Sequence, residues 1–127
     1  PGQPEAFFTR CTRTRKFFSV RLRYKTRVLG SAAYSLCAVA RGAAALGFQA
    51  TAKVWDIAAG WLILQEAGGV ADVRVGPQPF PVKPAQDFNK LKYPTMMAAD
   101  QSLADEMYRK ILPKKLLTRQ REAGLWG

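Results

Sequence analysis

Histidine is absent from the 127 residues, and cysteine occurs only twice, at Cys11 and Cys37. Without histidine the chain alone cannot assemble a Ser-His-Asp or Cys-His nucleophile, and two isolated cysteines exclude a Cys/His zinc site. Two lone cysteines in a hydrophobic sequence are more typical of buried thiols than of a disulfide. This usage favours a reducing compartment, either the cytoplasm or the stroma or matrix of an organelle.

Long apolar runs are also missing, because none reaches the ~20 residues that a membrane span needs. The chain begins Pro-Gly-Gln-Pro-Glu, without an initiator Met or a charged-then-apolar signal pattern, as expected of a fragment or a processed chain. A composition that is 48% hydrophobic and 11% aromatic nevertheless predicts a packed core.

Acidic residues are scarce, with 9 Asp and Glu against 20 Lys and Arg, so the formal net charge is +11. Such an excess favours an anionic partner or substrate. The basic residues gather towards the two ends of the chain. We therefore predict a basic N-terminal segment at residues 1–19, a folded unit at residues 20–112 and a basic tail at residues 113–127 that docks on a partner or is loosely ordered.

Alternation of apolar and basic residues from Val20 to Val28 predicts a β-strand with one basic face, and residues 7–16 suit a short strand or the start of a surface helix. Ser31 and Gly42 bracket a small apolar helix that we expect to be buried. The first turn of this helix offers backbone N–H groups to an anion or a hydroxyl. The residues alone favour the simpler interpretation, in which Ser31 only caps a core helix.

A second buried helix is predicted from Asp56, as its cap, to the glycine pair Gly68-Gly69. A short buried strand, or a turn into one, is expected at residues 42–48, and strands are expected at residues 70–75 and 93–99. Asp100 caps a last helix at about residues 102–112. The proline-rich segment 77–84 predicts an irregular loop with Phe80 and Val82 tucked inwards. This order of elements is typical of an α/β unit.

Two segments carry a family resemblance: Trp55-Asp-Ile-Ala-Ala-Gly60 with Glu66-Ala-Gly-Gly69, and Arg27-Val-Leu-Gly-Ser-Ala-Ala33. They resemble motifs of the inositol monophosphatase family, which are Mg²⁺-dependent, lithium-sensitive sugar phosphatases. The resemblance covers about residues 7–112 and only the C-terminal half of such an enzyme. It implies an α/β fold: the C-terminal layer unit of the inositol monophosphatase and fructose-1,6-bisphosphatase-like sandwich, a mixed sheet flanked by helices, here at residues 20–112.

The resemblance also implies roles for individual residues. Asp56 corresponds to a metal ligand that also contacts substrate, and the backbone of Ala32 and the side chain of Gln49 correspond to substrate contacts. Ser31 and Arg27 are candidates for binding an anion. Gln49 stands where the family has an acid, and Ala45 stands where it often has Asp, which argues against ordinary recognition of inositol phosphate.

Helical geometry separates Glu66 from this site. Asp56 and Glu66 are ten residues apart, or ~15 Å along an ideal helix, so they cannot share one metal ion. Lys53 adds a cation near the proposed site, although a solvated loop lysine is the simpler interpretation. One Asp supplies a single ligand to a hard cation such as Mg²⁺.

An Asp-Gly-Thr or Asp-Gly-Ser motif, which the family carries in its N-terminal half, does not occur in the sequence. We therefore assign no catalytic residue to this chain and expect Mg²⁺ binding only together with an N-terminal half. The main hypothesis is the C-terminal portion of a Mg²⁺-dependent phosphatase for inositol or sugar phosphate monoesters, inactive alone. Its partners are then a small phosphorylated sugar or polyol and its own N-terminal half.

The alternative hypothesis is a non-catalytic basic subunit of a larger assembly that reuses the half-domain. Its anionic partner is then an acidic protein, a nucleic acid or a lipid surface. Nucleic acid could bind through the basic residues of the predicted strand and tail, as a salt-sensitive contact without sequence preference. A solvated strand face and a frayed terminus explain the same charges somewhat better.

Overall fold

A five-stranded mixed sheet forms the centre of the computed structural model, which describes residues 7–76, 78–82 and 91–124. The strand order is β3 (Thr26–Arg27), β1 (Phe7–Arg10), β4 (Ala44–Ala52), β6 (Tyr93–Ala98) and β5 (Val70–Val73). β1 runs parallel to β3 and β4, whereas β6 is antiparallel to β4 and β5. The predicted α/β class with a mixed sheet is confirmed.

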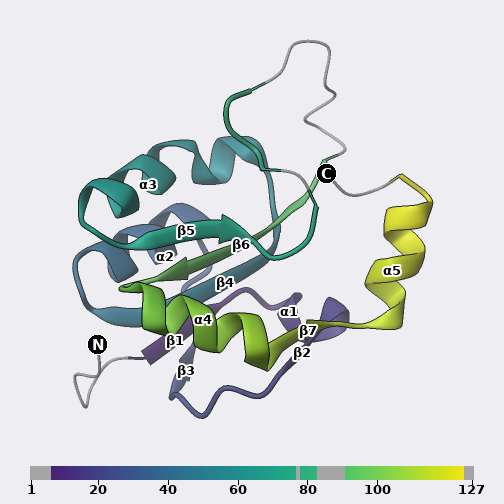
Figure 1. The fold of residues 1–127 in the computed structure, drawn as a ribbon, viewed down its shortest axis with the longest axis horizontal. Coiled ribbons are helices and arrows are strands. Elements are labelled where there is room, and N and C mark those ends of the chain that lie inside the picture. The colour runs from purple at the N-terminus through teal and green to yellow at the C-terminus, as the bar shows by residue number, and fades with distance from the viewer. Residues whose placement is uncertain (1–6, 77, 83–90, 125–127) are drawn as a thin grey trace.

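Helices cover both faces of this sheet (Figure 1). α2 (Ala32–Ala40) and α3 (Val54–Glu66) pack on one face, and α4 (Gln101–Lys110) packs on the other. The short α1 (Thr14–Phe17), the antiparallel pair of β2 (Phe18–Val20) and β7 (Ile111–Pro113), and α5 (Lys115–Glu122) lie at one side. None of the helices in the described ranges is long and apolar enough to span a bilayer.

Most of the predicted helix boundaries are confirmed. Ser31 caps α2, its Oγ accepting a hydrogen bond from Tyr34 N at 3.2 Å, and Asp100 Oδ1 accepts one from Leu103 N at 2.9 Å. Gly42 and Gly68 adopt positive φ angles of 82° and 86° just beyond α2 and α3. These stops require a conformation that residues with a Cβ rarely adopt.

The predicted cap of α3 is wrong by one turn. The helix begins at Val54, and Asp56 lies inside its first turn. Asp56 N donates to Lys53 O at 3.0 Å, while Asp56 Oδ2 accepts from Lys53 N at 3.0 Å. The aspartate therefore closes the start of the helix from within, as an acid does in a capping box.

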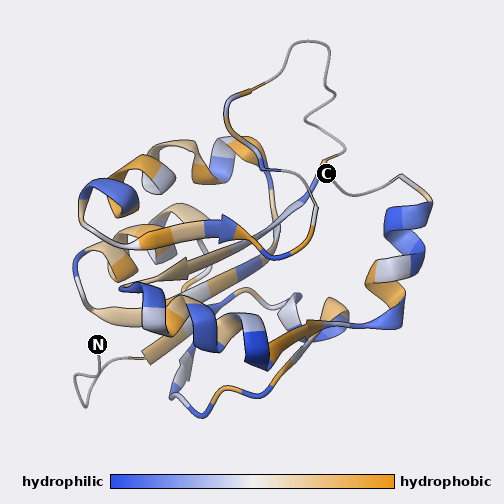
Figure 2. Cartoon of the chain, viewed as in Figure 1, coloured by the Kyte–Doolittle hydropathy of each residue, from blue (hydrophilic) through white to orange (hydrophobic). Residues whose placement is uncertain are grey.

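Burial of α2 and α3 on all sides is also wrong. Trp55 and Leu62 of α3 are 57% and 58% exposed, and Tyr34 of α2 is 50% exposed. The two helices lie side by side on the sheet, and no described element covers their outer side. Figure 2 shows both helices mostly in apolar and pale colours, in contrast to the hydrophilic outer side of α4.

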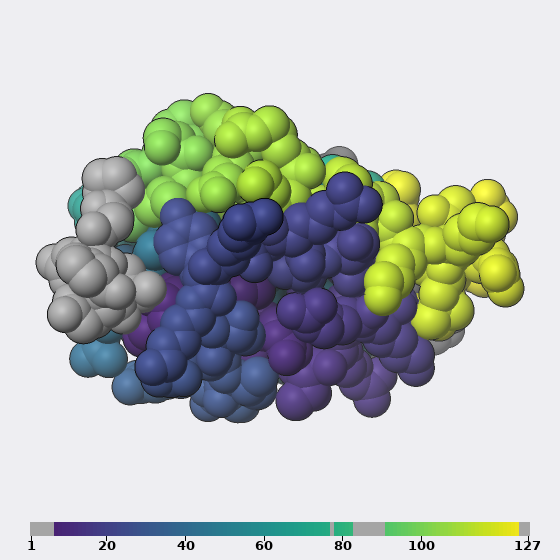
Figure 3. Space-filling view, turned by 90° about the horizontal axis from the view of Figure 1, so that it is seen from below, coloured from purple at the N-terminus to yellow at the C-terminus, as the bar shows by residue number. Residues whose placement is uncertain are grey.

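The strand predicted at residues 20–28 is not continuous. Val20 ends β2, which pairs with β7, whereas Thr26 and Arg27 form β3 and pair with β1 in the main sheet. The chain therefore passes from one sheet to another between these points. Its alternation still separates the side chains, because Arg21, Arg23, Lys25 and Arg27 are exposed while the residues between them are half-buried. Figure 3 shows this segment crossing the molecule beside α4, with α5 projecting beyond it.

The predictions for the cysteines, the proline-rich segment and the basic tail are confirmed only in part. Both cysteines are unpaired, as predicted, although each is only half-buried. Phe80 packs against Trp61 with ring centroids 5.5 Å apart, but Val82 is 53% exposed, and Pro77 and Pro84 lie outside the described residues. The described part of the basic tail forms α5, whose buried Leu117 joins the protein's own core, so this part is not loosely ordered. Docking of its exposed side on a partner stays a prediction.

The side chain of Arg74, just after β5, forms hydrogen bonds with the C-terminal end of α4. Its Nε donates to Ile111 O at 2.9 Å, its Nη2 donates to Tyr108 O at 3.4 Å, and its guanidinium lies 5.7 Å from the Tyr108 ring. Tyr108 in turn donates its hydroxyl hydrogen to Asp72 of β5. Burial lowers the pKa of Arg74, which stays protonated in the physiological range. The cation thus occupies the negative end of a helix dipole.

Replacing Arg74 by Met keeps most of the stem but removes both hydrogen bonds to these carbonyls. We expect the Arg74→Met variant to lose about 1–3 kcal/mol of unfolding free energy, measured by urea denaturation. Arg23→Met removes an exposed guanidinium and is the matched control, with a change within about 0.5 kcal/mol. Equal effects of the two substitutions would contradict the role of Arg74.

Gly60 allows α2 and α3 to approach closely. A Cβ at this position would lie 2.7 Å from Leu36 Cβ, which belongs to the buried core between the helices and the sheet. Such a contact is far shorter than van der Waals distance, and one of its atoms is the rigid first carbon of a side chain. The glycine therefore fixes how closely the two helices pack.

Gly60→Ala should destabilise the protein even though alanine favours helix by about 1 kcal/mol over glycine. We expect a net loss of about 1–3 kcal/mol because the helices must separate. The measurement is thermal or urea unfolding. Ala58→Gly, at an exposed position of the same helix, tests propensity alone and should cost about 1 kcal/mol. A stabilised Gly60→Ala variant would show that the helices have room to spare.

Candidate functional site

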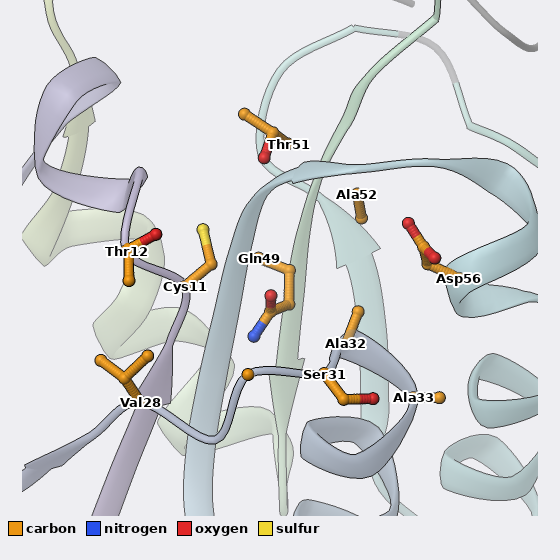
Figure 4. A pocket seen from close by; sticks show the side chains of 11 residues that line it. Cys11, Thr12, Val28, Ser31, Ala32, Ala33, Gln49, Thr51, Ala52 and Asp56 are labelled. Atoms are coloured by element: carbon orange, nitrogen blue, oxygen red, sulfur yellow. The ribbon is translucent and has the colours of Figure 1, made fainter.

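A cavity of about 380 Å³ opens where β1 and β4 end and where α2 and α3 begin (Figure 4). Because β1 and β4 are parallel, their carboxyl ends meet at the same edge of the sheet, which is where α/β proteins bind ligands. The lining residues come from these elements and from the loop between β3 and α2: Cys11, Thr12, Val28, Gly30, Ser31, Ala32, Ala33, Gln49, Thr51, Ala52 and Asp56.

Among the described residues, Asp56 supplies the only carboxylate of the lining. Its Oδ2 is held by Lys53 N, whereas Oδ1 has no hydrogen-bond partner within the described part of the chain. Figure 4 shows the carboxylate reaching from the start of α3 towards the cavity. One oxygen therefore fixes the side chain, and the other is available to a ligand.

The start of α2 forms the adjacent wall. Ser31, Ala32 and Ala33 line the cavity, and the first N–H groups of a helix have no partner within the helix. Ser31 is engaged as the cap through Tyr34 N. The helix start therefore offers backbone donors and a hydroxyl with remaining hydrogen-bonding capacity.

Gln49 lies between these two walls and is only 6% exposed. Its Nε2 donates to Ser35 Oγ at 3.2 Å, and Ser35 Oγ lies 3.1 Å from Thr9 Oγ1. This chain of hydrogen bonds engages the amide nitrogen and leaves Oε1 as an acceptor. Sequence reasoning missed Thr9 and Ser35; a serine on the otherwise apolar α2 was the signal that could have identified the second.

The structure brings most of the sequence-derived candidates together. Ser31, Ala32, Gln49 and Asp56 all line one cavity, although the roles assigned to them stay predictions. Arg27 does not line it and is exposed on the edge strand β3, while its neighbour Val28 does. Glu66 lies at the opposite end of α3 and takes no part in the lining. The sequence did not identify Cys11, Thr12 or Thr51 as neighbours of the cavity.

Cations flank the same opening. Lys53 follows the lining residue Ala52, and Ala52 pairs with Tyr93, so Lys92 lies at the same end of the sheet. Burial lowers the pKa of Lys92, and the nearby charges of Lys53, Arg13 and Lys16 lower it further. Lys53 is half-buried, so its interpretation as a solvated loop lysine is incomplete.

The donor set fits one coordination position of a hard cation, because a carboxylate oxygen is a ligand that Mg²⁺ prefers. Within the described ranges no three His, Cys, Asp or Glu side chains gather as a metal site. These residues can therefore contribute Asp56 Oδ1 to a metal site, but they do not form a complete one.

Comparisons with known proteins agree with this fold. Human "Inositol monophosphatase 2" is 44% identical over 52 residues, which make up 40% of this chain and 18% of the human protein. "Nus factor SuhB" of Pasteurella multocida (strain Pm70) is 54% identical over 44 residues, 35% of this chain and 16% of that protein. The matched segments thus span less than a fifth of either relative.

Among solved structures, 2'AMP-bound SaIMPase-II has a similar fold, with a TM-score of 0.64 at 17% identity. The match covers 97% of this chain and 48% of that one. The sequence profile described as "Inositol monophosphatase family" matches residues 4–112, which is most of the chain. The chain therefore belongs to the inositol monophosphatase family, a family of phosphatases, as its two motifs indicated.

Proposed function

We propose that the chain is the C-terminal portion of a Mg²⁺-dependent phosphatase that hydrolyses inositol or sugar phosphate monoesters. The observation that carries the proposal is the convergence of Asp56, Gln49 and the start of α2 on one cavity in a member of this family. The substrate is then a small phosphorylated sugar or polyol.

Each wall of the cavity has a distinct role in this proposal. Asp56 Oδ1 holds one position of the metal, and Mg²⁺, when bound, activates water and stabilises charge on the phosphoryl group. The Ala32 N–H and Ser31 offer donors to substrate oxygens, and Arg27 stays outside the cavity. Gln49 Oε1 accepts a hydrogen bond from a substrate hydroxyl, because Gln49 Nε2 already donates a hydrogen bond to Ser35 Oγ.

The proposal requires further residues beyond this chain. One carboxylate does not complete a Mg²⁺ site, since several oxygen ligands are needed. The exposed outer side of α3, formed by Trp55, Leu62 and Ile63, is a second argument, because such an apolar surface favours a covering partner. We assign that role to an N-terminal half of the same protein, as the chain covers 48% of the SaIMPase-II chain.

A second candidate is a non-catalytic basic subunit of a larger assembly. The net charge of +11 and the name of the "Nus factor SuhB" relative favour it, since that name describes a factor rather than an enzyme. Such a subunit binds an acidic protein, a nucleic acid or a lipid surface. Magnesium separates the two candidates, because only the phosphatase requires Asp56 to bind it.

Asp56→Asn tests the phosphatase in the intact protein. Asparagine keeps an oxygen for Lys53 N but removes the charge that binds the cation, so we expect Mg²⁺-dependent phosphate release to fall at least about 100-fold. Asp105→Asn, on the exposed side of α4, is the control and should leave the rate unchanged. The measurement is phosphate release from inositol 1-phosphate. Undiminished release by Asp56→Asn would overturn the metal-ligand role.

Leu62→Gln tests whether the outer side of α3 is covered in the intact protein. If an N-terminal half buries this side chain, the polar amide should cost about 1.5–3 kcal/mol of unfolding free energy. Leu112→Gln, at a residue that is 38% exposed away from α3, is the control, with an expected cost below about 1 kcal/mol. Equal small effects in urea denaturation would show that α3 faces solvent.

A further inference from the structure

A line of hydrogen bonds runs from Gln49 in the cavity lining to two fully buried hydroxyl groups. Gln49 Nε2 donates to Ser35 Oγ at 3.2 Å, and Ser35 Oγ lies 3.1 Å from Thr9 Oγ1. Ser35 and Thr9 have no solvent exposure, whereas Gln49 is 6% exposed and lines the cavity. The three side chains come from β4, α2 and β1, so tertiary packing brings them together.

The two ends of the Gln49 amide differ in their partners. Nε2 is engaged by Ser35, whereas Oε1 accepts no hydrogen bond from the described residues. Among those residues, Arg10 Nε is the only fully buried side-chain nitrogen or oxygen without a partner, so Gln49 Oε1 reaches the cavity. Figure 4 shows Gln49 between Cys11 on one side and Asp56 on the other. A ligand in the cavity therefore meets an acceptor at this position.

Ser35 decides which end of the amide faces the ligand. An amide can present either its oxygen or its nitrogen, because a half-turn about the last side-chain bond exchanges the two. In the structure Ser35 Oγ accepts from Nε2, and its own hydrogen is then available to Thr9 Oγ1. Buried polar groups need partners, so turning the amide over requires both hydroxyl groups to reverse their direction.

We propose that Ser35, supported by Thr9, is a positioning residue that sets the orientation of the Gln49 amide. The cavity then selects phosphate monoesters whose alcohol part donates a hydroxyl hydrogen to Gln49 Oε1. The ligand class rests on the proposed function, whereas the orientation of the amide does not. Ser35 does not line the cavity, so its effect on a ligand passes through Gln49.

The orientation is tested by NMR spectroscopy of the intact protein, labelled with ¹⁵N-glutamine and free of ligand. The Gln49 side-chain amide is assigned by its disappearance in Gln49→Glu, and the exchange of its hydrogens with solvent is then measured. Ser35→Ala should accelerate that exchange at least about fivefold, because Nε2 loses its acceptor.

Thr95→Val is the matched control for this measurement. Thr95 is also fully buried and pairs with Gln49 across the sheet, but its hydroxyl donates to Tyr93 O. Its replacement should therefore leave the exchange of the Gln49 amide within about twofold of the unmodified protein. Urea unfolding curves establish that each variant is folded.

Selectivity is tested with Mg²⁺ present, on inositol 1-phosphate and cyclohexyl phosphate. The two esters share a cyclohexane ring, but only the first carries further hydroxyl groups. Ser35→Ala should lower kcat/KM about fivefold for inositol 1-phosphate, mainly through a higher KM, and less than about twofold for cyclohexyl phosphate. In the Gln49→Glu background, Ser35→Ala should change the ratio of the two values less than about twofold, because both oxygens of a carboxylate accept.

Several outcomes would overturn the positioning role of Ser35. They are unchanged amide exchange in Ser35→Ala, an equal acceleration by Thr95→Val, and equal losses for the two esters. An undiminished effect of Ser35→Ala in the Gln49→Glu background would do the same, since a carboxylate has no orientation to set. An intact protein that hydrolyses neither ester refutes the proposed function, and the amide exchange then decides the role of Ser35 separately.

Discussion

The parallel pairing of β1 with β4 is the constraint on which the site depends. It places Thr9 opposite Gly47, and a Cβ on Gly47 would lie 2.7 Å from Thr9 Cγ2 and 2.8 Å from Met97 Cγ. Because Gly47 has no side chain, the side chain of Thr9 on β1 can pack against the backbone of β4. Thr9 then reaches Ser35 of α2, which binds the amide of Gln49. Close packing at Gly47 thus helps to orient the side chain of Gln49, which lies two residues further along β4.

Asp56 combines a structural role with an available ligand atom. Asp56 is the single acid among the described residues that line the cavity, and it stabilises the start of α3 through one oxygen while it leaves the other available. An acid in the first turn is favourable because it faces the positive end of the helix dipole. Structure and ligand binding therefore do not compete for this residue. Under the proposed function, a metal would use the Asp56 oxygen that Lys53 N does not engage.

Much of the fold could be predicted because local signals and tertiary packing agree at the ends of the helices. Ser31 and Asp100 act through side-chain hydrogen bonds to backbone three residues on, and Gly42 and Gly68 act through positive φ angles, so all four depend little on distant residues. The prediction of one continuous strand from Val20 to Val28 failed because alternation indicates which side chains face solvent, not which neighbouring strand the backbone pairs with. The side chains alternate as expected from Arg21 to Arg27 but not at Val28, which is 45% exposed, and the backbone changes partners from β7 to β1.

The candidate site also contains residues that the sequence identified and residues that it missed. Asp56, Ala32 and Gln49 were identified through family wording, and their shared cavity agrees with that origin. Thr9 and Ser35 were missed because they meet only where α2 packs on β1 in the folded protein. No local pattern encodes the proximity of Arg13 and Lys92, which are 79 residues apart in the sequence. Their proximity is a property of sheet topology, which sequence periodicity alone does not determine.

The two faces of the sheet differ in a way that connects stability with function. α4 turns a hydrophilic outer side to solvent, whereas α3 on the opposite face exposes Trp55 and Leu62. The cavity opens on the face of α2 and α3, at the starts of both helices. A proposed N-terminal half that covers α3 is therefore brought next to Asp56, where further metal ligands are needed. Under the proposed function, burial of the apolar helix surface and completion of the metal site would therefore be one event.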